Sequence, residues 1–418
     1  MTTPSSPRLG IRANLPQFAL LVLVNAFVGA MVGVERSVLP LSAEVEYGVE
    51  AHVALLSFVA AFGLSKATAN YAAGRLGDRF GRRPVLVGGW LLALPVPPLL
   101  AWAPTWGWVG ATNVLLGISQ GLTWSTTVVM KIDLAGPRRR GLAMGINEFA
   151  GYLAVGLSAL AAGYVAERYG LRPAPYLLAA AFAVAGVGLS AALVRETSGH
   201  VAVEHAQAPA VAERPSARRL FVHTAWSDPT LSSACQAGLV NNANDALAWG
   251  LFPVLFAAAG LSVGRIGVLA ALYPVVWAAG QIPAGLLSDR IGRKPLIVWG
   301  MLIQAAAIAL VAAGGTFSVY AVATVLLGLG TALVYPTLLA AVGDAASPTW
   351  RAEAVGIYRL FRDLGYVAGA VAAGVVADAA GVVAAVVVLA AATALSGIAV
   401  AVRMPRSHRA RGAPVRSD

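Results

Sequence analysis

Ionisable side chains interrupt the apolar stretches of this 418-residue chain. A charge in a hydrocarbon environment costs about 2.5–3.5 kcal/mol even on the most lenient scale, so each one needs a partner or a function. A buried carboxylate can carry a proton, because burial favours its neutral form. A buried base can attract an anion. The acidic residues of interest are Glu35, Glu148, Asp245 and Asp363, and the basic ones are Arg36, Lys66, Arg359 and Arg362.

Polar and aromatic residues recur on single helical faces beside these charges. One face, spaced i, i+4, i+7 and i+11, carries Gln120, Trp124, Thr127 and Lys131. Another, spaced i, i+4 and i+8, carries Asn241, Asp245 and Trp249, with Asn244 next to it. These faces indicate the walls of a wet cavity. Helix–helix hydrogen bonds and aromatic core packing are the alternative, and Lys131 could simply extend to the membrane interface.

The basic residues allow two arrangements. Lys66 can pair with Asp363, or it can join Arg36 and Arg362 in attracting an anion. Arg359 and Asp363 are four residues apart on one helix, so they can also neutralise each other.

Long apolar segments must position these residues. The chain is 58% hydrophobic and 12% charged, with a mean hydropathy of +0.73, and a soluble protein carries about twice that charged fraction. A membrane helix needs about 20 apolar residues. We therefore predict an all-α membrane protein with twelve spans, at 17–40, 52–73, 84–102, 107–130, 141–166, 174–194, 231–256, 265–287, 295–313, 317–341, 353–377 and 380–402.

Other classes of protein lack support. One cysteine, Cys235, excludes a disulfide framework, and five histidines show no metal-ligand spacing. No nucleophile–base arrangement or Walker motif is present. We expect no enzyme activity, no cofactor and no metal.

The basic residues also predict the topology. Most of the 30 Lys and Arg residues fall in the two tails, the middle loop and alternate connecting loops. By the positive-inside rule both termini face the cytoplasm. The net charge of +11 is then a topology signal and not a sign of nucleic-acid binding.

The chain is an internal repeat. The segment GRLGDRFGRRP from Gly74 recurs as GLLSDRIGRKP from Gly285, an offset of 211 residues. The same offset relates Asp133 to Asp344, Arg140 to Arg351 and Trp124 to Tyr335. We predict a tail at 1–16, a six-helix half at 17–194, a linker at 195–230, a second half at 231–402 and a tail at 403–418.

The doubled motif resembles the signature of the major facilitator superfamily, and the resemblance covers essentially the whole chain. It implies that spans 1, 4, 7 and 10 line a cavity, that spans 2, 5, 8 and 11 face the junction of the halves, and that the others lie outside. It also implies a cytoplasmic charge network that braces one conformation; the alternative is that these charges only fix topology. The network residues are Asp78, Arg79, Arg82, Asp133, Arg140, Asp289, Arg290, Arg293, Asp344 and Arg351.

Departures from the pattern leave the subfamily open. Drug:proton antiporters usually carry a basic residue where this chain has Asn113, and a proline-containing motif in the fifth span, which here has none. Sugar porters have a fuller signature where this chain has VRET, from Val194 to Thr197.

The resemblance implies secondary transport of a small solute by alternating access, with a proton as partner and the lipid bilayer as surroundings. We expect a monomer in the cytoplasmic (inner) membrane and assign proton coupling to Asp245, Glu148, Glu35 and Asp363. The bases favour an anionic substrate; a multidrug efflux antiporter is the alternative, and a non-transporting sensor is a third. The predicted substrate cavity comprises Arg36, Lys66, Gln120, Trp124, Asn241, Asn244, Trp249, Tyr335 and Arg362.

Overall fold

A computed structural model describes residues 9–135, 140–200, 216–346 and 350–405. Within these ranges the protein is helical and no strand occurs. Ten segments of the described chain are long and apolar enough to cross a membrane. The 30-residue helices α6 (Trp106–Ala135) and α11 (Pro229–Ala258) are as long, but their polar residues lower their hydropathy. Together with those ten they make the twelve predicted spans.

The first half contains six membrane-crossing segments. Two of them are broken, at Leu56 between α2 and α3 and at Leu94–Pro95 between α4 and α5. Besides α6, the segments are α1 (Leu15–Val45), α2 (His52–Leu55) with α3 (Ser57–Phe80), α4 (Arg82–Ala93) with α5 (Val96–Ala101), α7 (Arg140–Tyr169) and α8 (Ala174–Ala192).

The second half repeats this plan with unbroken helices. After α11 come α12 (Val263–Ile291), α13 (Arg293–Ala313), α14 (Phe317–Ala345), α15 (Arg351–Ala380) and α16 (Val382–Arg403). Between the halves, the predicted linker contains a short helix, α10 (Ala217–Val222), and a π-helical turn, η2 (His223–Ser227). The described part of the linker packs on the second half, because Phe221 and Trp226 contact Phe361 of α15.

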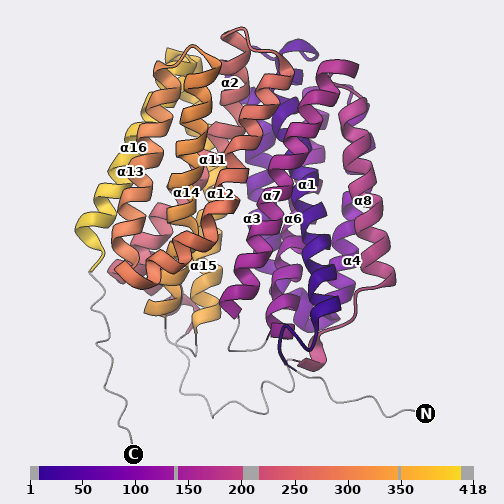
Figure 1. Ribbon diagram of the computed structural model, residues 1–418, viewed down its shortest axis with the longest axis vertical. Helices are drawn as coiled ribbons and strands as arrows, with labels where there is room; N and C mark the ends of the chain where they lie inside the picture. The colour runs from indigo at the N-terminus through magenta and orange to yellow at the C-terminus, as the bar shows by residue number, and fades with distance from the viewer. Residues whose placement is uncertain (1–8, 136–139, 201–215, 347–349, 406–418) are drawn as a thin grey trace, which may run out of the picture.

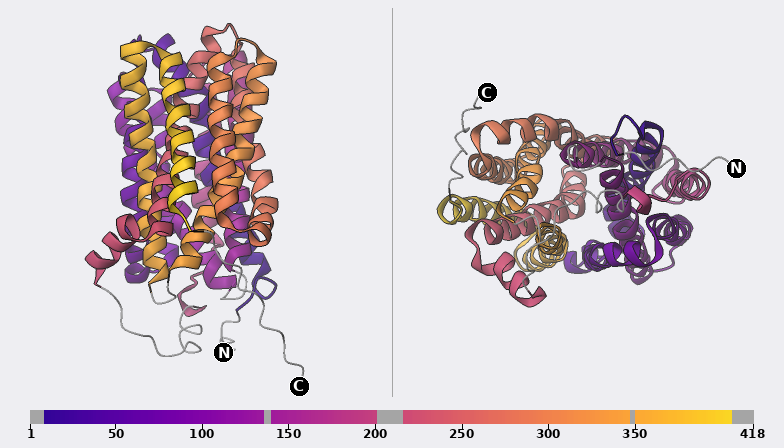
Figure 2. Two further views of the ribbon diagram at one scale, coloured as in Figure 1. Left: turned by 90° about the vertical axis from the view of Figure 1, so that its left-hand side faces the viewer. Right: turned by 90° about the horizontal axis from the view of Figure 1, so that it is seen from below.

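The two halves stand side by side, with α1 beginning and α16 ending at the lower end in Figure 1. Figure 2 shows the two groups of helices from below. Across the junction α3 packs on α15 and α7 packs on α12, as the family resemblance implies for spans 2, 11, 5 and 8.

The upper ends of the two halves are joined. The carboxylate of Asp378, near the end of α15, accepts hydrogen bonds from the backbone N–H groups of His52 (2.5 Å) and Val53 (3.0 Å) at the start of α2. One oxygen also lies 3.0 Å from His52 Nδ1. Asp378 therefore closes the upper end by capping a helix of the opposite half.

Glycines allow backbone-to-backbone contact at the same junction. A Cβ added to Gly163 of α7 would lie 2.7 Å from the Cα of Gly267 in α12. Real Cβ atoms do not approach this closely, so neither position accepts a side chain without movement of a helix. Small residues let membrane helices approach in this way.

The observed helices extend beyond most of the predicted spans. Helix α1 runs from Leu15 to Val45, where a span at 17–40 was predicted. Helix α7 runs from Arg140 to Tyr169, where a span at 141–166 was predicted. Hydropathy detects only the apolar core of a helix, and the polar ends at its two boundaries add one or two turns.

Candidate functional site

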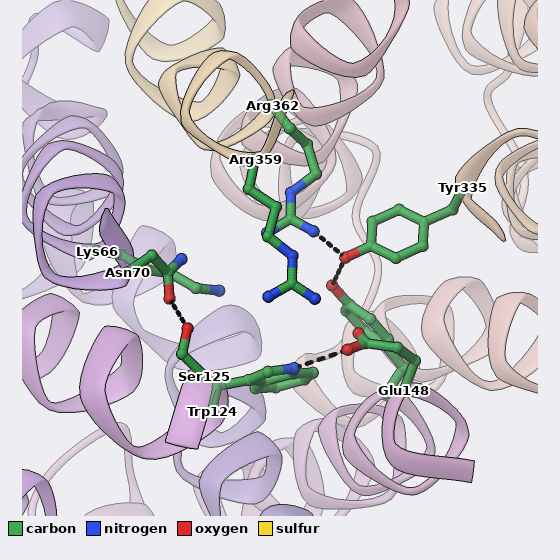
Figure 3. Close-up of a pocket in the computed structure, with 9 residues that line it drawn as sticks. Lys66, Asn70, Trp124, Ser125, Glu148, Tyr335, Arg359 and Arg362 are labelled. Atoms are coloured by element: carbon green, nitrogen blue, oxygen red, sulfur yellow. Dashed lines mark hydrogen bonds between the residues drawn. The ribbon is translucent and has the colours of Figure 1, made fainter. Parts of the chain in front are cut away.

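A cavity lies between the two halves, below the joined upper ends. The space among its lining side chains is about 280 Å³ when the open solvent at its mouth is counted, and most of it is not enclosed. Helices α3, α6 and α7 of one half and α14 and α15 of the other supply its walls (Figure 3). Its lining consists of Lys66, Asn70, Trp124, Ser125, Glu148, Tyr152, Tyr335, Arg359 and Arg362.

One hydrogen-bonded chain crosses the junction beside this cavity. Arg362 donates to Asp363 from Nε (2.8 Å) and Nη2 (2.6 Å), and its Nη1 donates to the hydroxyl of Tyr335. The other oxygen of Asp363 accepts from Asn70 Nδ2 of the opposite half at 2.6 Å. Asn70 in turn accepts from Ser125. Both oxygens of Asp363 are therefore occupied.

The two ion pairs proposed for Asp363 from the sequence are wrong in this structure. Arg362 and Asn70 take its oxygens, so neither Lys66 nor Arg359 pairs with it. The physical reason is geometric. Arg362 directs two N–H groups to one oxygen of the neighbouring carboxylate and Asn70 takes the other, so no oxygen remains for Arg359 one turn away.

Arg359 and Lys66 are the cavity-lining bases that form no ion pair with a described carboxylate. The Nε of Arg359 is buried and has no hydrogen-bond partner there, and its side chain points into the cavity (Figure 3). The Lys66 ammonium faces the rings of Phe62 and Trp124, each 5.3 Å from the ring centroid. Arg359 was not among the predicted cavity residues. Its position one turn before Arg362 was the signal that could have identified it.

The acidic wall is formed by Glu148. Its Oε1 accepts from Trp124 Nε1 (3.0 Å) and Asn147 Nδ2 (3.1 Å), while its buried Oε2 has no partner among the described residues. The side chain thus presents one unsatisfied oxygen.

Aromatic rings from both halves surround that acidic wall. The Tyr152 ring lies 5.3 Å from Trp124, 5.9 Å from Tyr335 and 3.6 Å from Trp277, measured between centroids. Trp124 and Tyr335, the predicted pair, therefore both contact Tyr152, which belongs to α7.

A second buried charge lies above the cavity, in the joined part of the molecule. The Arg36 guanidinium sits 4.5 Å from the Trp249 ring and 4.9 Å from the Phe62 ring. Its three nitrogens have no hydrogen-bond partner among the described residues. Trp249 stacks on Tyr366 at 5.4 Å, and Glu35, next to Arg36, is also buried with one unpartnered oxygen. These residues do not line the cavity in this conformation.

Three predicted cavity residues are instead buried in contacts within one half. Asn241 and Asn244 of α11 both hydrogen-bond Gln304 of α13 at 3.0 Å. Gln120 donates to the carbonyl of Val28 at 2.7 Å. These three residues therefore follow the alternative interpretation, hydrogen bonding between helices, because each amide finds an acceptor or donor on a neighbouring helix.

The remaining polar residues of those two faces also bond within one half. Asp245 accepts a hydrogen bond from Tyr273 of α12 and keeps one buried oxygen without a partner among the described residues. Lys131 donates to the carbonyl of Leu21 at 3.1 Å and is fully buried, so it does not extend to the interface.

Charged pairs at the lower end repeat between the halves. Arg82 lies 3.4 Å from Asp133, and the residues 211 positions later, Arg293 and Asp344, lie 2.9 Å apart. Arg293 also bonds Asp289 at 2.5 Å. These pairs join helix ends within a half, and none of them crosses the junction.

The other members of the predicted network contribute less to the described geometry. Arg79 lies 5.1 Å from the ring of Phe80, and Arg290 is exposed. The side chains of Asp78, Arg140 and Arg351 lie outside the described residues.

Glu196, in the VRET segment, completes the lower end of the first half. Its carboxylate accepts from the backbone N–H groups of Arg82 (3.1 Å) and Arg83 (2.9 Å), which begin α4. Burial raises the pKa of Glu196, but hydrogen bonds from Ser198 and from these N–H groups outweigh it and hold the pKa below its ordinary value. The adjacent Thr197 donates to Asp133 at 2.8 Å.

Comparisons with known proteins agree with this architecture. The model of the Major Facilitator Superfamily matches residues 19–243 and again 234–417. A 47-residue stretch is 55% identical to the inner membrane transport protein YajR of Escherichia coli; it covers 11% of this chain and only 10% of that relative. The chain is thus aligned with about a tenth of that protein's length.

Solved structures share the fold at low sequence identity. The nucleoside transporter NupG, as its D323A mutant, superposes with a TM-score of 0.74 at 12% identity, covering 93% of this chain and 100% of that one. A POT family transporter in complex with a thioalcohol-conjugated peptide gives 0.73 at 12% identity, covering 92% and 95%. Since the family model matches both halves in succession, this chain belongs to the major facilitator superfamily.

Proposed function

We propose that this protein is a secondary active transporter that moves a small anion across the membrane by alternating access, coupled to protons. The observation that carries the proposal is a cavity between the halves with two bases, Lys66 and Arg359, that form no ion pair with a described carboxylate. An uncompensated cation is expensive at membrane depth, and a bound anion would remove that penalty.

The two halves offer a route for alternating access. The upper ends are joined through Asp378, while the charged pairs of the lower end stay within each half. The cavity lies between these levels. Rocking of the halves about the junction helices would break the Asp378 contact and open the upper end.

Proton coupling is assigned to the buried carboxylates. Glu148, Asp245 and Glu35 each keep one buried oxygen without a partner among the described residues. Such an oxygen gains a hydrogen when the group is protonated. Glu148 is the first candidate because it lines the cavity. Asp363 is removed from this role, since Arg362 and Asn70 already occupy both of its oxygens.

The orientation follows from the basic loops. We propose that the lower end, with its Arg82 and Arg293 pairs, faces the cytoplasm, as the positive-inside rule implies. The E. coli relative is an inner membrane protein, which supports the same membrane here. We further propose that the transporter acts as a monomer with the predicted boundaries of halves and linker.

Efflux of amphipathic compounds is the second candidate. It is favoured by the aromatic cluster of Trp124, Tyr152, Trp277 and Tyr335 around the cavity. Against it stand the uncompensated bases, which would repel a cationic drug.

Transport in proteoliposomes tests the proposal. Purified protein is reconstituted, a pH gradient is imposed, and uptake of radiolabelled anions is compared with that of cationic drugs. Gradient-driven anion movement supports the proposal, and gradient-driven movement of cationic drugs alone would replace it with the second candidate.

Two variants make the assay specific. Arg359→Gln should abolish anion uptake, because it removes the unpaired guanidinium. Arg403→Gln is the matched control, since Arg403 lies at the end of α16 and bonds Ser232 at 3.2 Å, away from the cavity.

A further inference from the structure

The charges around the cavity favour an occupant with a single negative charge. Lys66, Arg359 and Arg362 bring three positive charges, and Glu148 and Asp363 bring two negative ones. With Glu148 deprotonated, the group therefore carries one net positive charge. A monoanion neutralises it, a dianion leaves an excess negative charge, and a zwitterion leaves the positive charge in place.

The available position for the anion is at Arg359. Arg362 already uses Nε and Nη2 on Asp363 and Nη1 on Tyr335. Arg359, by contrast, projects its guanidinium toward the centre of the cavity, between Trp124 and Tyr335 (Figure 3). A guanidinium and a carboxylate form two parallel hydrogen bonds, which suits a planar carboxylate.

The walls beside Arg359 favour a flat, apolar body. Trp124, Tyr152 and Tyr335 surround the site, and Trp277 backs Tyr152 at 3.6 Å between ring centroids. Offset or edge contacts between aromatic rings contribute about 0.5–1.5 kcal/mol each beyond burial. A small inorganic anion would make no ring contact with these side chains.

On the opposite wall, one oxygen of the Glu148 carboxylate lacks a hydrogen-bond donor within the described chain. Glu148 Oε2 is buried and has no partner among the described residues, and an unsatisfied buried acceptor costs about 1–3 kcal/mol. A hydroxyl on the far side of the occupant would satisfy it. The enclosed space in this conformation is only about 10 Å³, so an occupant of this kind enters when the two halves move apart.

We infer that the substrate is a single-ring aromatic monocarboxylate that carries a ring hydroxyl. Its carboxylate binds Arg359 with Lys66 nearby, its ring lies among Trp124, Tyr152 and Tyr335, and its hydroxyl donates to Glu148. This inference rests on the proposed anion transport and names the substrate of that same site.

A binding panel on the full-length protein in detergent tests the substrate class. The probe is 4-hydroxybenzoate, and binding is measured by calorimetry. Benzoate lacks the donor, cyclohexanecarboxylate lacks the aromatic ring, 4-hydroxybenzyl alcohol lacks the charge, phenylalanine is a zwitterion, and phosphate lacks the apolar body. We expect 4-hydroxybenzoate to bind best, and each single loss to weaken binding by about 3- to 100-fold.

Variants assign each contact. Arg359→Gln should weaken 4-hydroxybenzoate binding by about 10- to 100-fold, the usual effect of losing a hydrogen-bonded charge. Glu148→Gln should reduce the preference for 4-hydroxybenzoate over benzoate while leaving benzoate binding in place. Arg403→Gln should bind like the wild type, and a thermal melt of each variant confirms that it is folded.

Two results overturn the inference and differ in what they leave standing. If phosphate or an aliphatic carboxylate binds better and is taken up with the pH gradient, the substrate class is wrong but anion transport remains. If no anion binds or moves while a cationic drug does, both the substrate class and the proposed function are wrong.

Discussion

Asp378 should set the balance between the two access states. Its carboxylate receives two backbone hydrogen bonds from the start of α2, at 2.5 and 3.0 Å, and a third contact from the His52 ring at 3.0 Å. These contacts join opposite halves at the upper end, so they must break before that end can open. Replacing Asp378 by asparagine keeps the shape and removes the charge.

The size of the effect follows from these bonds. A hydrogen bond to a charged group contributes about 1.5–3 kcal/mol, and the 32% exposure of the Asp378 side chain reduces that to about 1–2 kcal/mol. The equilibrium should move toward the state open at the upper end by a factor of about 5 to 30.

Distance measurements between spin labels report this shift. Labels are attached to cysteines at Glu50 and Gly315, in upper loops of opposite halves, in a Cys235→Ala background. Asp378→Asn should enlarge the population with the longer distance. Asp228→Asn is the matched control, because Asp228 caps α11 with two similar backbone bonds, from Thr230 (2.9 Å) and Leu231 (2.8 Å), inside one half. Equal distance distributions in wild type and Asp378→Asn, or an equal shift in the control, would refute the reasoning.

Three further predictions concern the coupling, packing and lower end of the protein. Asp245→Asn should abolish gradient-driven movement but leave substrate exchange, measured in the same proteoliposomes. Gly117→Leu should lower the melting temperature, with a cost of about 1–3 kcal/mol, because a Cβ there would lie 2.0 Å from Ser65 Oγ, whereas Gly110→Leu meets nothing within 4 Å and should not. Since the folded pKa of Glu196 is lowered, its capping contribution is complete above about pH 4.5 and disappears as pH falls through the lower folded value. A Glu196→Gln variant should therefore lose less thermal stability than the wild type on acidification below about pH 4.5.

The sequence predicted the architecture well because hydropathy and the repeat act over long segments. The offset that relates Gly74 to Gly285 also relates the Arg82–Asp133 pair to the Arg293–Asp344 pair. A repeated sequence places equivalent residues at equivalent helix ends, so one symmetry determines both pairs.

The cavity was less predictable because its lining depends on which neighbours compete for each side chain. Asn241 and Asn244 have the pattern of a wet wall, yet Gln304 from another helix takes both amides. Asp363 could have paired with Arg359, but Asn70 reaches it from the opposite half and Arg362 from the adjacent position. No spacing along one helix contains that information.

The contact of Gly163 with Gly267 has a mechanical consequence for the junction of α7 and α12. Two bare backbones meet at this point, whereas Tyr152 and Trp277 pack against each other elsewhere along the same pair of helices. An alanine at Gly163 would place a methyl group against the Gly267 backbone and push α7 and α12 apart. We expect it to slow the relative motion of the two halves while leaving the side chains of the distant cavity unchanged.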